Sequence, residues 1–443
     1  MKLDYKRTIL VGFAFLSICS FWQMYNSVIP LVLTNTFHIN ETWSGVIMAA
    51  DNVLALFLLP LFGAVSDRSR FKMGRRKPFI LFGTVVAVIL MFFLPILDNS
   101  YYAAPAAWKL TAFICVLGLL LFAMGTYRSP AVALMPDVTP KPLRSKGNAV
   151  INLMGAVGGI LYLVIAAELY NSKATAGLAH VNYFKLFAVV AGIMLVSILI
   201  VAYFIREPEL VQKTQAYEAA HPEENLTEVD ESGKESLPPA VKRSLGFLLV
   251  SIALWFIGYN AIETWFTTYA NHVWNMSLGS ASVCLTVATA GAILAYLPIG
   301  MIASRIGRKI TILCGVTLLA LCFFAAFLYT LGNDGFSPAL YVLFALVGLA
   351  WAAINVNSLP MVVEMCKGSE VGKFTGYYYT FSMAAQTITP IAAGALLHNV
   401  SYMTLFPYAA LFVALSFVTM LFVRHGDNKI EAKKGLEAFD VGD

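Results

Sequence analysis

The chain of 443 residues is 59% hydrophobic and only 12% charged, with a formal net charge of +5 and a mean hydropathy of +0.74. A soluble domain is typically about a quarter charged and just under half apolar, and it cannot hide this much apolar surface from water. The 13% of aromatic residues also excludes a disordered chain. The composition therefore predicts a polytopic membrane protein.

Twelve apolar runs, each long enough to form a bilayer-spanning helix, follow one another along the chain. They lie near residues 8–34, 43–65, 78–97, 110–135, 148–170, 183–205, 244–271, 279–303, 309–331, 338–364, 374–397 and 402–423. The first run is too long for the apolar core of a signal peptide and lacks a small-residue cleavage site. The runs are continuous rather than alternating, which argues against a β-barrel. We predict an all-α protein of twelve transmembrane helices.

The Lys and Arg residues of the loops lie almost all on one side of the predicted bundle. If the N-terminus is cytoplasmic, 26 of the 30 lie in cytoplasmic segments and three, Lys109, Lys173 and Lys185, in outer loops, while Arg128 lies inside an apolar run. Short cytoplasmic loops of membrane proteins are enriched in Lys and Arg. We therefore predict that both termini are cytoplasmic and that the protein lies in a plasma membrane, such as a bacterial inner membrane.

The composition changes abruptly between the sixth and seventh runs. Residues 206–242 are polar, rich in acidic residues and contain a Pro-Pro pair near their end. Such a stretch is typical of a solvated tether between structural units. We predict an N-terminal six-helix bundle over 1–205, a cytoplasmic linker over 206–242, a C-terminal six-helix bundle over 243–424 and a cytoplasmic tail over 425–443.

The two halves echo each other at two places. The loop between the second and third helices reads GAVSDRSRFKMGRRK in the first half (63–77) and GMIASRIGRK in the second (300–309). The ends of the fourth helices read RSPAVALMPD (128–137) and NVNSLPMVVE (355–364). Internal duplication of six-helix units is common in secondary transporters, which bind substrate near the membrane midplane at the interface of the two halves.

Two sets of six helices with a duplicated G-x-x-x-D-R-x-G-R-[RK] loop resemble the major facilitator superfamily. The second copy has Ser304 where the acid of the motif stands, and the first has four extra residues before Gly74. This longer loop, ending GRRKPFI, is similar to that of the glycoside–pentoside–hexuronide cation symporters and the related sucrose transporters. The stretches SPAVALMPDVTP, REPE and GKFTGYYYTFSMAAQTITP agree. The resemblance implies a twelve-helix sugar transporter.

The chain departs from these families at positions that matter for binding. The sodium-using type of the symporter family carries two carboxylates on its second helix, where this chain has Ala55 and Leu59. A sugar-binding aspartate of the fourth helix falls on Arg128, and the aspartate and arginine expected of sucrose transporters fall on Gly125 and Val132. The resemblance therefore does not imply a sodium site and does not transfer the families' sugar contacts.

Three charged residues fall inside the predicted spans: Asp51 on the second helix, Arg128 on the fourth and Glu263 on the seventh. A charge in the hydrocarbon region costs about 2.5–3.5 kcal/mol on insertion scales, which makes each residue a functional candidate. Desolvation favours the protonated form of a carboxyl group. We therefore predict that Asp51, or alternatively Glu263, carries a coupled proton. The alternative is an interior ion pair that only holds helices together.

A sugar site needs polar groups for the hydroxyls and aromatic rings for the sugar faces. Such side chains recur on the predicted helices 1, 4, 7 and 10, which by resemblance line the transport cavity, and on helix 11. The candidate substrate-binding residues are Trp22, Tyr25, Asn26, Arg128, Tyr259, Asn260, Glu263, Trp351, Asn355 and Gln386. Gly125 and Ser129 are expected to leave room beside Arg128. Packing, lipid contact and interhelical hydrogen bonds are the alternatives for these side chains.

The basic loop after the second helix has two candidate roles. Its Lys and Arg residues are an orientation signal, and the resemblance implies a second role in gating, with Asp67 bound to helix ends and cations on the inner side. The candidate gating residues are Asp67, Arg68, Gly74, Arg75, Asp137, Arg305 and Arg308.

Other functional classes lack a sequence motif. No GxxxxGK[ST] is present for ATP-driven transport, no GxSxG or HExxH for a hydrolytic enzyme, and no CxxC or Cys/His cluster for a metal. The net charge lies mostly in loops and indicates topology rather than nucleic acid binding. We predict no catalytic residues, no metal and no cofactor.

Together these features predict a monomeric sugar importer in the lipid bilayer, for a disaccharide or glycoside, that works by alternating access. The coupling ion is predicted to be the proton rather than sodium. Two alternatives stay open. One is a proton-coupled exporter of amphipathic compounds, which an aromatic-rich cavity would also suit, and the other is a non-transporting membrane sensor of the same fold.

Overall fold

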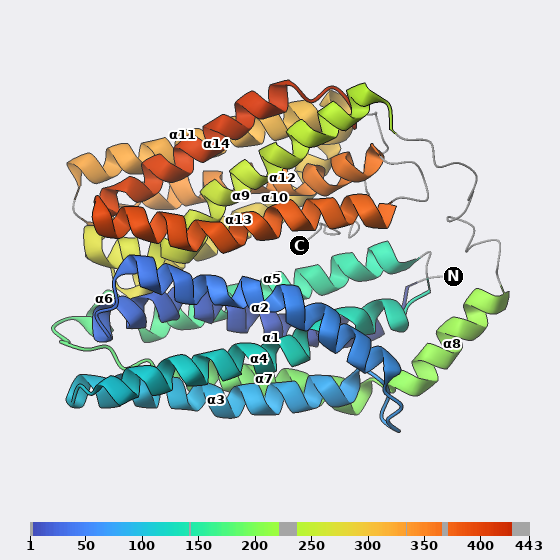
Figure 1. The fold of residues 1–443 in the computed structure, drawn as a ribbon, viewed down its shortest axis with the longest axis horizontal. Coiled ribbons are helices and arrows are strands. Elements are labelled where there is room, and N and C mark those ends of the chain that lie inside the picture. The colour runs from blue at the N-terminus through green and yellow to red at the C-terminus, as the bar shows by residue number, and fades with distance from the viewer. Residues whose placement is uncertain (1–2, 141–142, 221–236, 334, 366–370, 428–443) are drawn as a thin grey trace. The chain divides into compact units, whose positions relative to one another are not determined.

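The protein is described by a computed structural model that covers residues 3–140, 143–220, 237–333, 335–365 and 371–427. Within these ranges the regular secondary structure is entirely helical, and twelve helices are long and apolar enough to cross a membrane (Figure 1). This confirms the predicted all-α class and the number of spans. The acidic part of the predicted linker, 221–236, and most of the predicted tail, 428–443, lie outside the described residues.

The chain divides into two compact units. Unit 1 takes in residues 1–40, 50–225 and 277–282, and unit 2 takes in 41–49, 226–276 and 283–443. The spanning helices mainly in unit 1 are α1 (Tyr5–Leu31), α2 (Glu41–Arg68), α3 (Lys77–Ala103), α4 (Ala107–Asp137), α5 (Arg144–Leu169) and α7 (Phe184–Phe204). Those mainly in unit 2 are α9 (Pro239–Trp274), α10 (Leu278–Ile306), α11 (Arg308–Gly332), α12 (Ala339–Glu364), α13 (Val371–Asn399) and α14 (Leu405–Leu421).

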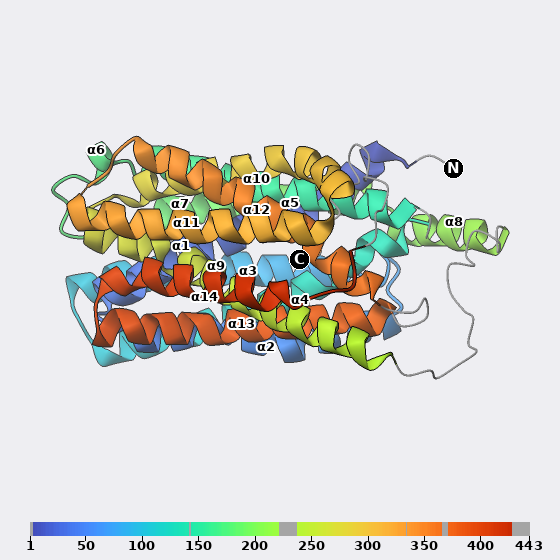
Figure 2. The ribbon, with the colours of Figure 1, turned by 90° about the horizontal axis from the view of Figure 1, so that it is seen from above.

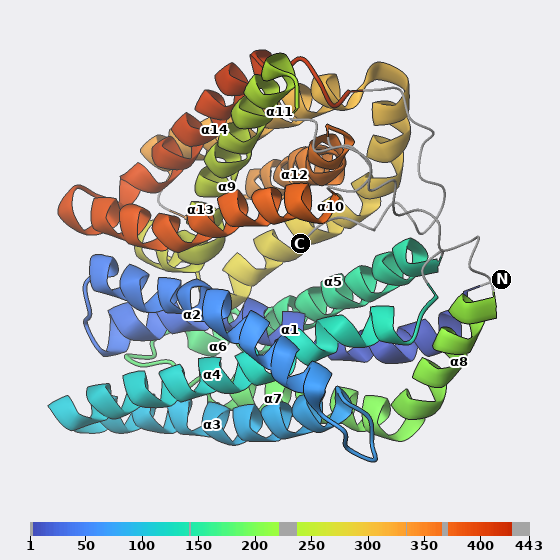
Figure 3. The same cartoon turned by 45° about the vertical axis from the view of Figure 1, so that its right-hand side comes forward.

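Each unit is a bundle whose helices pack in the same kind of layers. In unit 1, α1 lies against α5 and α7, and α3 lies against α4 and α7 (Figure 3). In unit 2, α9 lies against α13 and α14, and α11 lies against α12 and α14 (Figure 2). Glycine lets α1 and α5 approach each other closely, because Gly158 of α5 faces the main chain of Leu16 on α1. Ser20 of α1 also donates a hydrogen bond to the Gly158 carbonyl at 2.7 Å.

Some helix ends have a local cause. Asp4 caps α1 by accepting a hydrogen bond from the backbone N–H of Arg7 at 3.1 Å. Pro30 interrupts the hydrogen bonding of α1, and the chain continues as a π-helix, η1 (Val32–Thr36), in which Thr34 donates to the Pro30 carbonyl. The helix α3 runs to Ala103, six residues beyond the predicted run, so that it includes Asp98.

The second spanning helix of each half begins in the opposite unit. Residues 41–49 of α2 pack within unit 2, where Gly45 lies so close to the carbonyl of Pro390 that a Cβ would collide with it. Residues 277–282 pack within unit 1, where Gly279 donates its N–H to the carbonyl of Tyr170 at 2.9 Å. This feature repeats between the halves, as the loop motif does.

Two shorter helices belong to unit 1. One is α6 (Ser172–Thr175), and the other is α8 (Glu207–Ala220), which follows α7 and extends beyond its end (Figure 1). Residues 207–220 of the segment predicted as a solvated linker (206–242) are therefore helical, and residues 239–242 form the start of α9. Within α8, Glu207 and Thr214 are buried.

Candidate functional site

In unit 1, α1 and α4 bring Trp22, Tyr25 and Arg128 together. The rings of Trp22 and Tyr25 pack edge to face with centroids 5.4 Å apart, and the guanidinium carbon of Arg128 lies 5.8 Å from the centre of the Trp22 ring. Among the described residues, Arg128 makes no hydrogen bond or ion pair. Its five N–H donors are therefore available to a ligand, while the cation–π contact holds the head group in place.

The space beside Arg128 is occupied by α2. At Gly125 a Cβ would lie 2.9 Å from Leu58 Cδ1, and the Ser129 hydroxyl donates to the Leu59 carbonyl at 2.8 Å. The prediction that these two small residues leave room beside Arg128 is wrong. They allow close packing of α4 on α2, because a small residue lets two helices approach.

Asp51 and Asn26 are the other two candidates of unit 1. Asp51, on α2, is half-buried and interacts electrostatically with the phenol of Tyr25. Asn26, on α1, is also half-buried. The candidate coupling acid and two candidate substrate-binding rings are therefore within one unit.

In unit 2, α9 and α12 place two aromatic rings face to face. Tyr259 and Trp351 stack with centroids 3.7 Å apart and planes 7° apart, and Phe256 packs edge to face on Trp351 at 5.4 Å. Each stacked ring thus covers one face of its partner, and a sugar ring can stack only on a face that the partner ring does not cover. Glu263, one turn beyond Tyr259, is exposed although Ile262 and Thr264 beside it are buried.

Two amides complete the candidates of this unit. Asn355 lies one turn after Trp351 on α12, and Gln386 lies on α13; both are half-buried. Asn355 stands nine residues before the acid that ends α12, as Arg128 stands nine residues before the acid that ends α4. The duplication thus puts an amide in unit 2 at the position of the cation in unit 1.

Several buried polar atoms in these clusters lack a hydrogen-bond partner within the described part of the chain. They are Trp22 Nε1, the Tyr25 hydroxyl, Trp255 Nε1 and Asn260 Nδ2. An unsatisfied buried donor costs about 1–3 kcal/mol, and such groups are rare in folded proteins unless a ligand or water satisfies them. The donors therefore mark both clusters as places where a polar ligand would gain hydrogen bonds.

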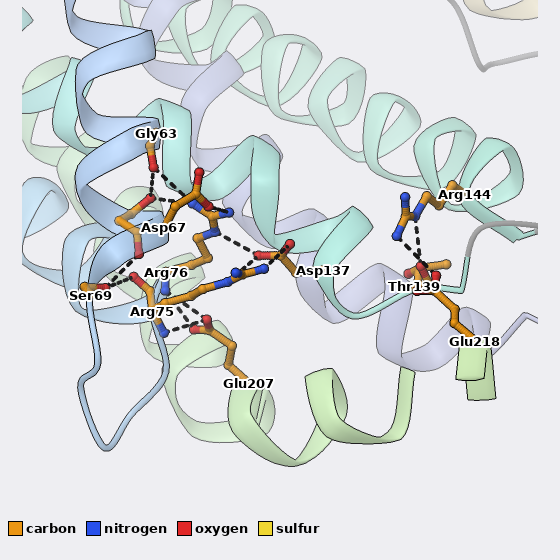
Figure 4. Close-up of polar contacts among 11 residues, drawn as sticks. Gly63, Asp67, Ser69, Arg75, Arg76, Asp137, Thr139, Arg144, Glu207 and Glu218 are labelled. Carbon is orange, nitrogen blue, oxygen red and sulfur yellow. Dashed lines mark hydrogen bonds and ion pairs between the residues drawn. The ribbon is translucent and has the colours of Figure 1, made fainter. Parts of the chain in front are cut away.

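A second site lies at the inner end of unit 1, meaning the end that carries the basic loops (Figure 4). Asp137, at the end of α4, accepts from Arg75 Nη2 at 2.7 Å and from Arg76 Nε at 2.8 Å. Arg76 also pairs with Asp67 at the end of α2. Of the predicted gating residues, Asp67, Arg75 and Asp137 are thus brought together, and the central cation is Arg76, which the sequence analysis did not select.

The carboxylate of Glu207 caps the start of α3. It accepts the backbone N–H groups of Arg75 at 2.8 Å, Arg76 at 2.9 Å and Lys77 at 2.9 Å (Figure 4). An acid at a helix N-terminus satisfies free N–H groups and interacts favourably with the helix dipole. Gly74 is required here because its φ is +111° and a Cβ would occupy the position of the Glu207 carboxylate.

Unit 2 carries a counterpart of this network. Arg308 pairs with Glu364 at the end of α12, as Arg76 pairs with Asp137. The Asp427 carboxylate accepts the backbone N–H of Lys309 at 3.2 Å and that of Arg308, and it faces Gly307, whose φ is +97°. The duplicated loop motif therefore builds the same cap twice, with a carboxylate that follows the sixth helix of each half.

The lysine that ends each duplicated loop, Lys77 or Lys309, binds the C-terminal end of the sixth spanning helix of its half. Lys77 Nζ donates to the carbonyls of Ala202 and Ile205, both at 2.7 Å, at the end of α7. Lys309 Nζ donates to the carbonyls of Leu421 at 3.0 Å and Val423 at 2.6 Å, at the end of α14. These carbonyls have no partner within their own helices, and a cation at a helix C-terminus is favourable.

Other predicted gating residues do not take part. Arg68 and Arg305 are exposed and make no ion pair within the described ranges. Sequence reasoning also missed Glu207, Asp427 and the two lysines as partners of the loops. The signal for them was the duplication itself, because each half places an acid shortly after its sixth helix.

Known sugar transporters resemble this chain in sequence and in fold. The family described as MFS/sugar transport protein matches residues 11–423. The sucrose transport protein SUT3 of Oryza sativa subsp. indica is 30% identical over 152 residues, which cover 32% of this chain and 30% of that protein. The proton-associated sugar transporter A of Homo sapiens is 31% identical over 115 residues, which cover 24% of this chain and 15% of that protein.

The matched stretches thus span less than a third of the length of these relatives. Similarity in fold extends much further. The inward open conformation of the xylose transporter XylE from E. coli has a TM-score of 0.69 and covers 97% of this chain and 98% of its own, at 14% sequence identity. This similarity concerns the fold alone, and it agrees with the fold that the resemblance to the major facilitator superfamily implies.

Proposed function

We propose that this chain, which belongs to the MFS/sugar transport protein family, imports a disaccharide or glycoside together with protons. As a member of this family it is a multi-pass membrane transporter rather than an enzyme. The named relatives transport sucrose or are proton-associated sugar transporters, which supports both the substrate class and the coupling ion. We place the protein in a plasma membrane, as a monomer.

The observation that carries the sugar proposal is the stacked pair Tyr259–Trp351 with unsatisfied and charged polar groups nearby. Asn260 has a buried amide nitrogen without a hydrogen-bond partner among the described residues, and Glu263 is exposed one turn along α9. A sugar offers weakly polar ring faces and many hydroxyl groups. An aromatic platform with adjacent amide and carboxyl groups suits both.

Arg128 supplies the matching chemistry in unit 1. Its planar guanidinium can bind two neighbouring hydroxyls at once, and the Trp22 ring beside it offers a second apolar surface. We propose that each unit carries sugar-binding groups of its own: Arg128 and Trp22 in unit 1, and Tyr259, Trp351 and their polar neighbours in unit 2. Asn26 is assigned to the sugar-binding groups of unit 1, and Asn355 and Gln386 are assigned to those of unit 2.

We assign the coupled proton to Asp51. This acid is half-buried on α2 and interacts with Tyr25. Its charge state can therefore affect the sugar-binding residues of unit 1. The positions at which sodium-using relatives carry their two carboxylates hold Ala55 and Leu59. A single carboxyl group suits a proton better than sodium, which prefers several oxygen ligands.

We assign gating to the inner networks around Asp137 and Glu364. Charged hydrogen bonds hold together the ends of α2, α3, α4 and α7 in unit 1, and the ends of α11, α12 and α14 in unit 2. Such a network keeps the inner end of a unit rigid while the unit moves as a body, which alternating access requires.

Transport in proteoliposomes tests the proposal. Labelled glycosides should accumulate when the outside is more acidic, and a sodium gradient at equal pH should drive no uptake. Efflux of amphipathic compounds against a proton gradient, with no sugar uptake, would instead indicate an exporter. The absence of both uptake and counterflow with every sugar tested would indicate a sensor.

A further inference from the structure

A buried acid that the proposed transport cycle does not use lies at the outer end of unit 1. Asp98, near the end of α3, is 1% exposed. Within the described part of the chain, neither carboxyl oxygen has a hydrogen-bond partner within 3.5 Å. The space beside it is too small for a water molecule and is lined by apolar side chains that include Ile29, Leu94 and Phe113. A carboxylate anion is costly in such surroundings, whereas a neutral carboxyl group is tolerated.

Two polar side chains lie near the Asp98 carboxyl group. Nε2 of His180 lies 3.6 Å from Asp98 Oδ2, and the side chain of Thr36 on η1 also interacts with the Asp98 carboxyl group. The His180 side chain is 13% exposed, and its ring stacks on Tyr102, which is exposed, at 4.4 Å. The imidazole therefore lies between the buried carboxyl group and the surface.

The surrounding amides determine which imidazole nitrogen carries the proton. Asn182 Oδ1 accepts the backbone N–H of Phe184 at 2.9 Å, and the same oxygen accepts from Asn99 Nδ2 at 2.9 Å. The Asn99 oxygen must then face His180 Nε2, at 2.9 Å. Neutral His180 therefore carries its hydrogen on Nε2, the nitrogen that also faces Asp98.

No other group around Asp98 in the described chain titrates near neutral pH. Burial raises the pKa of Tyr170 to about 12, and burial with the nearby Asp98 charge raises the pKa of Tyr183. Lys109 of α4 directs its ammonium group to the carbonyls of Ser100 and Ala104, at 2.8 and 2.7 Å. Burial lowers the pKa of His180. At neutral pH the imidazole is therefore mostly neutral and able to accept a proton at Nδ1 while donating from Nε2.

We propose that Asp98 and His180 form a proton-binding pair, in which the buried carboxyl group holds the proton and the imidazole transfers it to and from water. When Asp98 takes up a proton, the ring gains a proton from solvent at Nδ1 and gives its Nε2 hydrogen to the carboxylate, which leaves the ring as the Nδ1–H tautomer. Deprotonation is the reverse: the carboxyl proton returns to Nε2 and Nδ1 releases a proton to solvent, so that no other reactant is needed. Proton binding by this pair stands independently of transport. Its role as an outer proton entry point rests on the proposed proton coupling.

Infrared difference spectroscopy on the purified full-length protein tests proton binding directly. The wild type should show a carbonyl band of a protonated carboxyl group that disappears as the pH is raised, and labelling all aspartates with ¹³C should shift this band. Asp98→Asn should remove one component of this band, whereas Asp51→Asn and Asp67→Asn should leave that component in place. An aspartate band that Asp98→Asn leaves unchanged, or no aspartate band at any pH, would overturn the proposal. Loss of the band on adding sodium at constant pH would also overturn it, in favour of a cation site.

The transfer role of His180 has a separate readout. When the protein is moved into heavy water, the carboxyl band should shift rapidly in the wild type and more slowly in His180→Gln. His398→Gln is the matched control, because His398 pairs with Glu41 within unit 2. Equal exchange rates in wild type and His180→Gln would remove His180 from the pair. If the band behaves as expected but uptake needs no proton gradient, the pair stands and the proposed coupling fails.

Discussion

The phenol of Tyr259 and the indole of Trp351 lie in parallel planes within van der Waals contact, although they come from helices that are far apart in the sequence. Each ring supports the other, and Phe256 packs edge to face on Trp351. The pair is therefore a rigid surface on which a sugar ring can stack without an additional ordering cost.

Trp351→Ala should weaken sugar binding by removing this surface. An aromatic pair contributes about 0.5–1.5 kcal/mol beyond simple burial, which corresponds to a rise of roughly 2- to 12-fold in the half-saturation constant. Uptake kinetics with a labelled glycoside measure it. Trp108→Ala is the matched control, because Trp108 is 64% exposed near the outer end of α4. An unchanged half-saturation constant in Trp351→Ala would mean that the pair only packs helices.

Asp51→Asn should abolish uphill accumulation but retain exchange of sugar between equal pools. The amide keeps the size of the side chain but cannot take up and release the coupled proton. Glu263→Gln is the informative comparison, since Glu263 is the other acid inside the spans that sequence analysis selected. If Asp51→Asn still accumulates sugar and Glu263→Gln does not, coupling belongs to Glu263.

Arg128→Lys should raise the half-saturation constant strongly with normal protein levels in the membrane. Lysine keeps the charge near Trp22 but cannot bind two hydroxyls in one plane. Loss of one charged hydrogen bond costs about 1.5–3 kcal/mol, or roughly 10- to 150-fold in affinity. Arg305→Lys, at an exposed arginine on α10, should be silent. Near-wild-type kinetics for Arg128→Lys would show that the guanidinium does not bind the sugar.

Gly74→Ala should destabilise unit 1, because the new Cβ would meet the Glu207 carboxylate and alanine disfavours a φ of +111°. A residue forced into such a conformation costs about 1–3 kcal/mol. Gly118→Ala is the control, since no atom lies within 4 Å of its added Cβ and alanine favours the helix. Thermal unfolding in detergent should show a lower midpoint for Gly74→Ala only; equal midpoints would mean that Glu207 moves aside freely.

Asp137→Asn should disturb the inner end of unit 1 more than Asp67→Asn. The Asp137 side chain is 14% exposed and binds two arginines, whereas Asp67 is 54% exposed and binds one. Charged hydrogen bonds at the buried acid contribute about 1.5–3 kcal/mol each, against about 0–1 kcal/mol for an exposed pair. Labelling of single cysteines near the inner helix ends should increase in both variants, and most in Asp137→Asn. The reverse order would make Asp67 the principal contact.

The spans were predictable because a lipid-exposed helix must be apolar along its whole length, and all twelve runs coincide with helices to within several residues. Asp98 was missed because it lies just beyond an apolar run, where sequence alone places a loop. Arg76 and Arg68 could not be distinguished either, since both stand in one basic loop. The structure distinguishes them: after the backbone turn at Gly74, Arg76 binds Asp137, whereas Arg68 is exposed.

The carboxylates that cap α3 and α11 each follow the last spanning helix of their own half: Glu207 comes directly after α7, and Asp427 comes shortly after α14. Each half thus contains every side chain that its inner network uses. A gene divided between the codons for Ala220 and Pro238 should therefore yield two polypeptides that fold at their inner ends independently and reassemble into an active carrier. A second fragment that stops before Asp427 should not complement the first.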